Sequence, residues 1–243
     1  MATLLTDTYE SYGTGTGTLP APYEVFAVLA NVRVASGVAH AGSQAISMQA
    51  TALLAGPALT ADAINPAGSG GAFDVTAWGF RKTGIASGFG SDPGIVRGLS
   101  IVVGDDGNWG FRDTDVYVGF ENPAGTLDLR FFSTYNADSI TVVGIIIADT
   151  WQKFRIVGRQ SSVTEGGSPS VNADGSCQVY VDDGLVISQT GLRMAATRSF
   201  GVNTWEGVWF QVNGYLDDIV VTNGTVVRRS MFRKAGSRTV DNL

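Results

Sequence analysis

The stretch that decides the fold is Cys177-Gln-Val-Tyr-Val-Asp-Asp-Gly-Leu-Val-Ile-Ser-Gln-Thr190. In its first half, Cys177, Val179 and Val181 alternate with Gln and Tyr, which is typical of a strand with one buried face. The Asp-Asp-Gly that follows supplies the positive backbone φ angles of a tight hairpin turn, and a second strand-like run comes after it. The stretch therefore predicts two antiparallel strands, with Cys177 as a small core residue.

Short strand-like runs of the same kind extend over most of the chain. Helical periodicity is scarce, and turns rich in Gly, Asn and Asp separate the runs. The Ala-rich segment 49–63 is the only plausible short helix, and the Ser- and Gly-rich segment 160–176 is expected to be a long surface loop. We therefore expect an all-β protein, an antiparallel β-sandwich of two packed sheets with at most one short helix. The twelve expected strands are 25–34, 45–50, 72–81, 95–103, 115–120, 127–135, 139–147, 151–158, 177–181, 185–190, 207–212 and 215–222.

The composition excludes several classes of protein. The chain has 243 residues, is 44% hydrophobic and carries a formal net charge of −6, so it can bury a core and is not of the disordered type. Cys177 is the only cysteine, which excludes a disulfide scaffold and a Cys/His zinc site. The longest aliphatic run, 142–148, is far shorter than the roughly 20 residues of a membrane-spanning helix. The first residues lack the features of a signal peptide, so we expect synthesis without export by that route.

Residues of the common catalytic sets are scarce. His40 is the only histidine, and the alternation places Cys177 in the core, so a Ser/His/Asp or Cys/His set is not expected. Glycoside hydrolysis needs two carboxylates about 5 to 10 Å apart. The five glutamates do not occur in an acid-x-acid strand pattern. We therefore predict that the protein is not an enzyme.

Motifs near both ends of the chain resemble those of one family. The early motifs are Asp7-Thr-Tyr-Glu-Ser-Tyr-Gly13, Leu19-Pro20 and Ala39-His-Ala-Gly-Ser-Gln-Ala-Ile46. The late motifs are Trp151-Gln-Lys-Phe-Arg-Ile156, Cys177-Gln-Val-Tyr-Val-Asp182 and Tyr215-Leu-Asp-Asp-Ile-Val-Val221. Together they resemble concanavalin A-like, or laminin G-like, jelly-roll domains, which include carbohydrate-binding modules. The resemblance implies a jelly roll, in which the first and last strands can lie side by side.

The resemblance also implies one structural calcium ion. The related modules hold it with the Glu of the early motif, a closing-strand Asp and backbone oxygens near the Ala-His-x-Gly turn. Carried onto this sequence, the ligands are Glu10 with Asp217 or Asp218. An alternative stays open, in which the two aspartates make hydrogen bonds to backbone N–H groups without a metal. No other cofactor is expected.

Exposed aromatic residues would carry glycan binding in such a domain, by stacking on sugar rings. The best patch combines Trp205 and Trp209, four residues apart and so on one face of an extended strand, with Gln211 on the same face. Trp109 is a further candidate. Two other tryptophans, 78 and 151, lie in strand patterns that favour burial. Burial of all five tryptophans in the core is the alternative.

Basic residues gather at the C-terminal end of an otherwise acidic chain. The segment 228–243 contains five basic residues and one acid, and an acidic body disfavours nucleic-acid binding. The segment is expected to be a solvated end or an arm that docks on an acidic neighbour, with contact to packaged nucleic acid as a less favoured alternative. The five basic residues are Arg228, Arg229, Arg233, Lys234 and Arg238.

Our leading hypothesis is a non-enzymatic structural protein on a bacteriophage particle. A lectin-like sandwich with a basic arm is typical of capsid-decoration and tail or fibre proteins. Its partners would be other virion proteins, capsid or tail, and further copies of itself, and it would reach the virion after synthesis in the host cytoplasm. The expected parts are a segment 1–23 that joins the sandwich, the sandwich 24–227 and the arm 228–243. The alternative is a carbohydrate-binding module or adhesin that recognises a host glycan.

Overall fold

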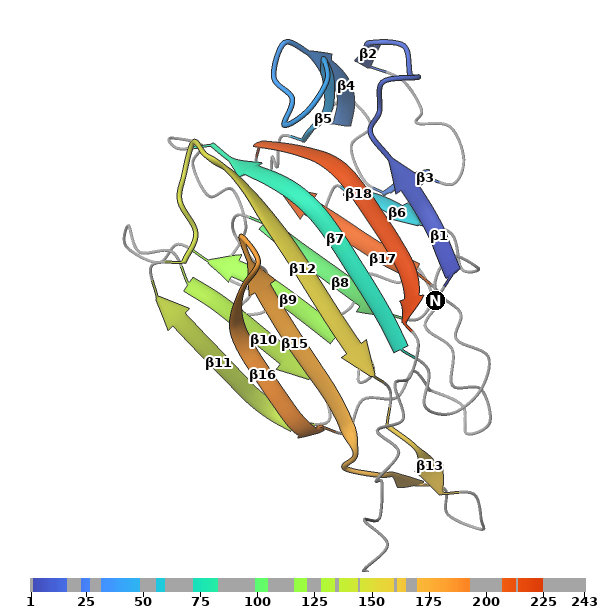
Figure 1. Cartoon of the computed structure of the whole chain (residues 1–243), viewed down its shortest axis with the longest axis vertical. Coiled ribbons are helices and arrows are strands. Elements are labelled where there is room, and N and C mark those ends of the chain that lie inside the picture. The colour runs from blue at the N-terminus through green and yellow to red at the C-terminus, as the bar shows by residue number, and fades with distance from the viewer. Residues whose placement is uncertain are drawn as a thin grey trace, which may run out of the picture.

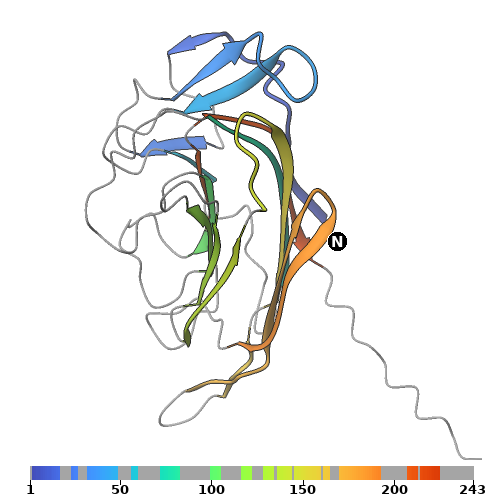
Figure 2. The ribbon, with the colours of Figure 1, turned by 90° about the vertical axis from the view of Figure 1, so that its left-hand side faces the viewer.

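In the computed structural model, the described residues form two β-sheets that pack face to face (Figures 1 and 2). Every regular element among them is a β-strand, which confirms the expected all-β class. The described part of the chain accordingly contains no helix of the length and hydropathy needed to span a membrane. The described residues are 2–16, 23–26, 32–48, 56–59, 72–82, 99–104, 116–121, 128–133, 136–143, 145–159, 161–164, 170–192, 207–212 and 214–224.

One layer is a nine-stranded antiparallel sheet. Its main path runs in the order β16, β15, β12, β7, β18, β5, β4 and β2, and β1 joins it by pairing with β18. In chain order, its strands are β1 (Ala2–Asp7), β2 (Gly15–Thr16), β4 (Val32–Ser36), β5 (Gln44–Met48), β7 (Ala72–Arg81), β12 (Trp151–Arg159), β15 (Gly175–Val181), β16 (Gly184–Leu192) and β18 (Gly214–Gly224).

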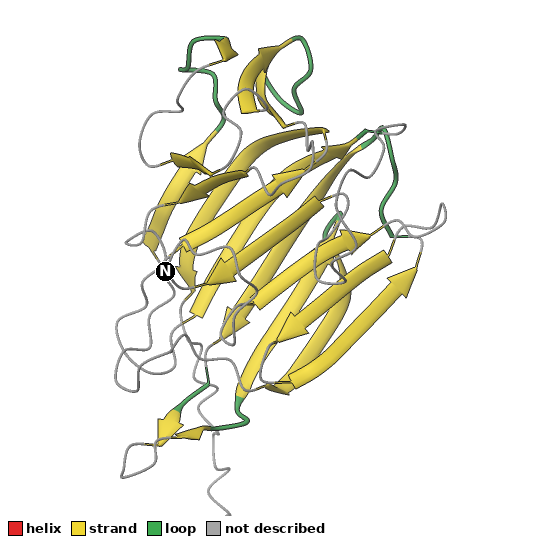
Figure 3. Ribbon diagram, turned by 180° about the vertical axis from the view of Figure 1, so that it is seen from behind, coloured by secondary structure: helices red, strands yellow, loops and turns green. Residues whose placement is uncertain are grey.

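The other layer is a seven-stranded antiparallel sheet, which faces the viewer in Figure 3. Its order is β11, β10, β9, β8, β17, β6 and β3. In chain order, its strands are β3 (Tyr23–Phe26), β6 (Gly56–Leu59), β8 (Leu99–Gly104), β9 (Val116–Glu121), β10 (Asp128–Ser133), β11 (Asn136–Val143) and β17 (Gly207–Val212). Two further strands, β13 (Val163–Thr164) and β14 (Ser170–Val171), form a small ribbon of their own.

Alternation along the strands separates a core face from an outer face. In β7, Phe73, Val75 and Ala77 are buried, whereas the residues between them are half-buried. Strands β12 and β15 repeat this pattern. Phe210 and Val212 of β17 are also buried, so the core lies between the two layers. Burial of this apolar surface is the main stabilising term of the fold.

The hairpin predicted around Asp182 and Asp183 is confirmed. Strands β15 and β16 pair antiparallel, and Val181 lies opposite Gly184. Asp182 and Asp183 have φ angles of 50° and 64°, the two positive values that a tight primed turn requires. Cys177 is fully buried, as expected, and burial raises the pKa of its thiol to about 12. The thiol is therefore a core group and not a nucleophile at neutral pH.

The expected pairing of the first and last strands is also confirmed. Strand β18 has β7 along one edge, and on the other edge β5 lies beside its first residues and β1 beside its later ones. In Figure 1, β7 and β18 run side by side at the centre of the nine-stranded sheet, with β1 to the right of β18 and β5 above its start. The end of the described chain thus completes the middle of a sheet that its beginning also joins.

Three local expectations are wrong in part. The segment 49–63 contains the strand β6 where a helix is expected, because β6 pairs with both β3 and β17. The expected single strand 25–34 ends in β3 and begins again in β4, and these belong to different sheets. The expected loop 160–176 contains β13, β14 and the first residues of β15. In each case pairing with another segment decides the structure, and local composition does not report it.

Gly158 leaves room for an aromatic ring in the core. It lies directly opposite Phe73 in the β12–β7 pair, and a Cβ at position 158 would overlap the ring of Phe73. Because Phe73 is fully buried, its ring cannot move without disturbing the core. We predict that Gly158→Ala lowers the free energy of unfolding by about 1 to 3 kcal/mol, measured by urea denaturation.

Gly13→Ala is the matched control for this substitution. No atom lies within 4 Å of a Cβ built at Gly13. The control should leave the free energy of unfolding nearly unchanged, since surface substitutions usually change it by less than about 0.5 kcal/mol. An equal loss of stability in the two variants would contradict the packing explanation.

Candidate functional site

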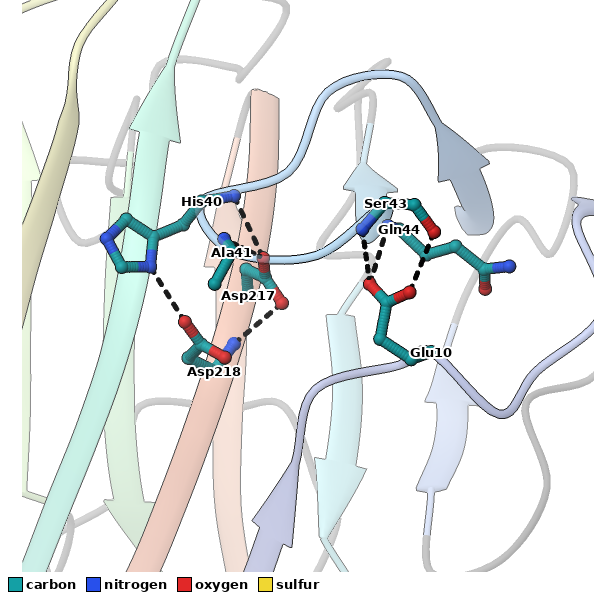
Figure 4. Close-up of polar contacts among 7 residues, drawn as sticks. All are labelled: Glu10, His40, Ala41, Ser43, Gln44, Asp217 and Asp218. Carbon is teal, nitrogen blue, oxygen red and sulfur yellow. Dashed lines mark hydrogen bonds and ion pairs between the residues drawn. The ribbon is translucent and has the colours of Figure 1, made fainter.

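A short turn, residues 37–43, connects β4 to β5 and reaches the edge of β18 (Figure 4). Its ends are joined by the N–H of Gly37, which donates to the carbonyl oxygen of Ser43 at 3.1 Å. Gly42 has a φ angle of 73°, in the left-handed region that glycine adopts without strain. A Cβ at this position would overlap the carboxylate of Glu10. Glycine therefore allows a carboxylate to lie directly against the turn.

Glu10 binds one side of the turn. Its carboxylate accepts hydrogen bonds from the N–H groups of Ser43 and Gln44, at 2.7 and 2.8 Å, and from the Ser43 hydroxyl at 2.7 Å. These donors, the Ser43 hydroxyl first, lower the pKa of Glu10. Asp7, at the end of β1, shapes the backbone that carries Glu10, because it accepts the N–H of Tyr9 two residues later at 2.8 Å.

Asp217 binds the other side of the turn. Its Oδ2 accepts the N–H groups of His40 and Ala41 at 2.9 and 3.3 Å, and its Oδ1 accepts the N–H of Asp218 at 2.8 Å. Asp217 is fully buried, and burial raises its pKa, although the three N–H groups oppose the shift. Two successive N–H groups of the turn thus share one carboxylate oxygen of β18, which ties the turn to this strand.

The acids expected to hold calcium therefore hold the turn. Both oxygens of Glu10 and both of Asp217 accept N–H or O–H groups, and an oxygen of Asp218 faces the ring of His40. Within the described ranges, no three acidic, histidine or cysteine side chains form a group that could hold a metal ion. The hydrogen bonds of Asp217 to backbone N–H groups are those of the alternative without metal. Calcium binding stays a prediction.

A bulge in β18 gives the two consecutive aspartates different tasks. Pairing with β7 is regular up to Asp217 and resumes at Val220. Asp218 lies in the bulge with a φ angle of 47°, a conformation that Asp tolerates better than most residues. Asp217 consequently faces the backbone of the turn, while Asp218 faces the ring of His40 (Figure 4).

The turn also places His40 against two tryptophans. The imidazole stacks on Trp78 of β7, with ring centroids 3.5 Å apart and planes 12° apart, and it meets Trp151 of β12 edge-on at 6.0 Å. Its Nδ1 lies 2.7 Å from Oδ2 of Asp218. Because an ionised carboxylate only accepts hydrogen bonds, Nδ1 of His40 is the donor in this contact. The side chain of His40 is 27% exposed, so a ligand can reach the ring.

An aromatic row lies beside His40 on the outer face of the nine-stranded sheet. Trp151, Phe80 and Tyr215 occupy one register position on the adjacent strands β12, β7 and β18. Their rings meet edge-on, with centroids 5.5 Å apart between Trp151 and Phe80 and 5.8 Å apart between Phe80 and Tyr215. All three are half-buried, so part of each side chain reaches solvent. We call these three residues the aromatic row.

Ion pairs continue the same outer face. Lys153 contacts Asp183 at 2.8 Å, and Arg155 donates two hydrogen bonds to Asp74, at 2.9 and 2.6 Å. The hydrogen bonds to Asp74 are the main reason that the pKa of Arg155 is raised. The outer face therefore combines aromatic rings with fixed hydrogen-bonding groups.

The structure describes only part of the glycan patch predicted from the sequence. Trp209 and Gln211 lie in β17 of the seven-stranded sheet, where they alternate with the buried Phe210 and Val212. Trp205 and Trp109 lie outside the described residues, and so do the five basic residues of the segment 228–243. The patch, the docking arm and the boundaries of the three predicted parts stay predictions.

The sequence does not predict the aromatic row or the stacking of His40, because the strand patterns of Trp151, in the row, and Trp78, under His40, favour burial. The structure places both on the outer face, half-buried. The signal is present in the alternation of each strand: Trp78 shares its phase with Asp74, and Trp151 shares its phase with Lys153. A charged residue in the same phase marks the face that is turned away from the core.

Comparisons with known proteins show the fold. No family model and no curated protein matches the chain. Among solved structures, the alginate lyase Aly36B has a TM-score of 0.50 at 12% identity, over 89% of this chain and 95% of that one. A carbohydrate esterase from the Shiga toxin-encoding bacteriophage phi24B has a TM-score of 0.49 at 12% identity, over 92% and 99%. The carbohydrate-binding module CBM66 from Bacillus subtilis has a TM-score of 0.37 at 10% identity, over 81% and 92%. Similarity at such low identity shows the fold alone, an antiparallel sandwich of the jelly-roll type.

The prediction that the protein is not an enzyme is contradicted. The similar structures include an enzyme, the alginate lyase Aly36B, so this architecture is one that supports catalysis. The prediction rested on catalytic sets that can be recognised from local spacing. It did not consider side chains brought together from distant segments, such as His40 and Asp218, which are 178 residues apart.

The hydrogen bonds that Glu10 accepts from the turn should make the stability of the protein depend on pH. Its pKa is lowered from an ordinary value of 4.5, so its contribution to stability is complete above pH 4.5 and is lost as the pH falls through the lower folded value. We predict that Glu10→Gln lowers the urea midpoint at neutral pH, and that the difference from the wild type narrows below pH 4.5. A difference that stays constant down to about pH 3 would show that the charge of Glu10 does not hold the turn.

Proposed function

We propose that the protein binds a carbohydrate chain through the aromatic row. The observation that carries the proposal is the alignment of Trp151, Phe80 and Tyr215 at one register position on three adjacent strands. Neighbouring strands lie about 4.8 Å apart, so the row extends across the sheet for about 10 Å. This length suits an extended ligand better than a single small group.

The chemistry of the face supports this ligand class. A sugar ring has an apolar C–H face and a polar rim, so its site needs an aromatic surface with hydrogen-bonding groups beside it. The aromatic row supplies the surface. His40, the Lys153–Asp183 pair and the Arg155–Asp74 pair supply donors and acceptors on the same side of the sheet. The jelly-roll architecture shared with an alginate lyase is compatible with such a ligand.

The first test is the removal of one ring from the row. A panel of neutral and acidic polysaccharides is screened by affinity electrophoresis, and the best ligand is measured by calorimetry. We predict that Trp151→Ala weakens binding by about 1 to 3 kcal/mol, because stacking area is lost. Ile147→Ala is the control, since Ile147 is an apolar residue outside the row with 55% exposure.

A second variant decides between the two sheets. Trp209 lies in β17 and belongs to the patch predicted from the sequence. If Trp209→Ala weakens binding and Trp151→Ala does not, the ligand binds at the seven-stranded sheet and the aromatic row is not its site.

Proton transfer on the bound chain is a second candidate function, favoured by the contact between His40 and Asp218. Asp218 fixes Nδ1 of His40 as the donor, so Nε2 is left to accept a proton, and the carboxylate stabilises the imidazolium that forms. Stacking on Trp78 holds the ring in one orientation beside the aromatic row. A fixed imidazole that accepts a proton is the general base of many enzymes.

This candidate is tested by incubation of the purified protein with each polysaccharide that it binds. Shortening of the chains is followed by size-exclusion chromatography. We predict that His40→Gln lowers the rate by about 100-fold or more, the usual contribution of a general base, while calorimetry still detects binding. Binding without shortening by the wild type would leave carbohydrate binding as the function and remove the catalytic candidate.

The virion role predicted from the sequence stays a prediction. Its docking arm, residues 228–243, lies outside the described residues. Location in a virion and partners among capsid or tail proteins also stay predictions. Carbohydrate binding, the alternative at the sequence level, has the better support because it rests on described residues.

A further inference from the structure

Two cations that form no ion pair with a described residue lie beside one end of the aromatic row. The ammonium group of Lys82, which follows the end of β7, lies over the ring of Tyr215 at 5.6 Å from its centroid. Tyr215 is opposite Ser47 of β5, and Ser47 is opposite Arg33 of β4. Ser47 and Arg33 therefore occupy the same register position as the aromatic row, and they add a hydroxyl and a guanidinium group beside Tyr215.

These two cations differ from three others on the same outer face, which have partners among the described residues. Arg159, at the other end of β12, donates to the carbonyl oxygen of Asp174 at 2.6 Å. Lys153 is paired with Asp183, and Arg155 is paired with Asp74. Lys82 and Arg33 are exposed, and neither forms an ion pair with a described residue. In a chain with a net charge of −6, two exposed cations without an acidic partner among the described residues are a local exception.

The described acids around this part of the sheet are already engaged. The N–H of Asp149 donates to the carbonyl oxygen of Arg81 at 2.7 Å, and the Asp149 carboxylate acts electrostatically on the Arg81 guanidinium. Asp217 accepts three backbone N–H groups, and Asp218 faces the ring of His40. Glu10 accepts its donors from the turn 37–43. None of these carboxylates is available to neutralise Lys82 or Arg33, so an anion supplied by a ligand can pair with both.

We propose that the ligand is an anionic carbohydrate, and that Lys82 and Arg33 bind its negatively charged group next to Tyr215. This inference rests on the proposed carbohydrate-binding function and specifies the class of ligand. Strands lie about 4.8 Å apart, so the backbones of Arg33 and Tyr215 are separated by about 10 Å. An anion above Ser47 is within reach of a long side chain from either side, and the Ser47 hydroxyl can donate to it. Charge-assisted hydrogen bonds of this kind are stronger than neutral ones.

The test compares three polymers on the full chain: polygalacturonate, which carries carboxylates, dextran sulfate, which carries sulfate esters, and neutral dextran. We expect at least one acidic polymer to bind roughly tenfold more tightly than dextran, and the difference to decrease as salt is added. The preferred acidic polymer identifies the anion. The double variant Lys82→Ala with Arg33→Ala should lose this preference.

Two controls separate specific binding from general charge attraction. Arg159→Ala removes an exposed cation from the same face, at the end of β12 away from Trp151, and it should keep the preference. The exchange Lys82→Arg with Arg33→Lys keeps both charges and should keep most of the affinity. Both positions are exposed, so circular dichroism should show folded protein in every variant.

The results that would overturn the inference are distinct from those that would overturn the proposed function. Equal binding of dextran and the acidic polymers overturns the anionic class and leaves carbohydrate binding intact. A preference that survives the double variant overturns the assignment to Lys82 and Arg33. Binding of no polymer overturns the proposed function, and the inference with it.

Discussion

The register between β12, β7 and β18 is the constraint on which the core and the outer face both depend. Residues opposite one another on paired strands point to the same side of a sheet. In one phase, Ile156, Val75 and Val221 form a buried line across the three strands. In the other phase, the same alignment forms the aromatic row. A slip of one residue in β12 would bury Lys153 and expose apolar side chains, so the packing of the core also protects the outer face.

The turn 37–43 is bound by one carboxylate that follows the first described strand and by another in the last described strand. Glu10 follows β1, Asp217 lies in β18, and the two strands are paired with each other. The two carboxylates bind the same backbone in opposite electrostatic conditions. Glu10 is exposed and surrounded by donors, so its pKa is lowered, whereas burial raises the pKa of Asp217. The position of His40 thus depends on two carboxylates. The lowered pKa of Glu10 favours its ionised form, and the raised pKa of Asp217 disfavours its ionised form.

The fold was more predictable from the sequence than the site. Alternation in β7, and the Asp182–Asp183 turn, indicated strands and a hairpin because each is decided by neighbouring residues. The strand β6 was missed because its pairing partners lie elsewhere in the chain. The family motif correctly indicated that Glu10 and Asp217 approach the Ala-His-Ala-Gly turn. It could not show that their oxygens accept backbone N–H groups, since the same spacing of acids along the chain suits metal binding and hydrogen bonding to the backbone alike.

The position of β18 has a consequence for synthesis on the ribosome. Strand β18 lies between β7 and β5 in the nine-stranded sheet, yet residues 214–224 are translated after every other described strand. Until they emerge, β7 has one edge without a partner, and β1 has none of the pairing that it makes in the finished sheet. Pairing between such distant segments is slow, and open strand edges are prone to aggregation. The nascent chain therefore completes this sheet only after residues 214–224 have left the ribosome, and the edges of β7 and β1 stay open until then.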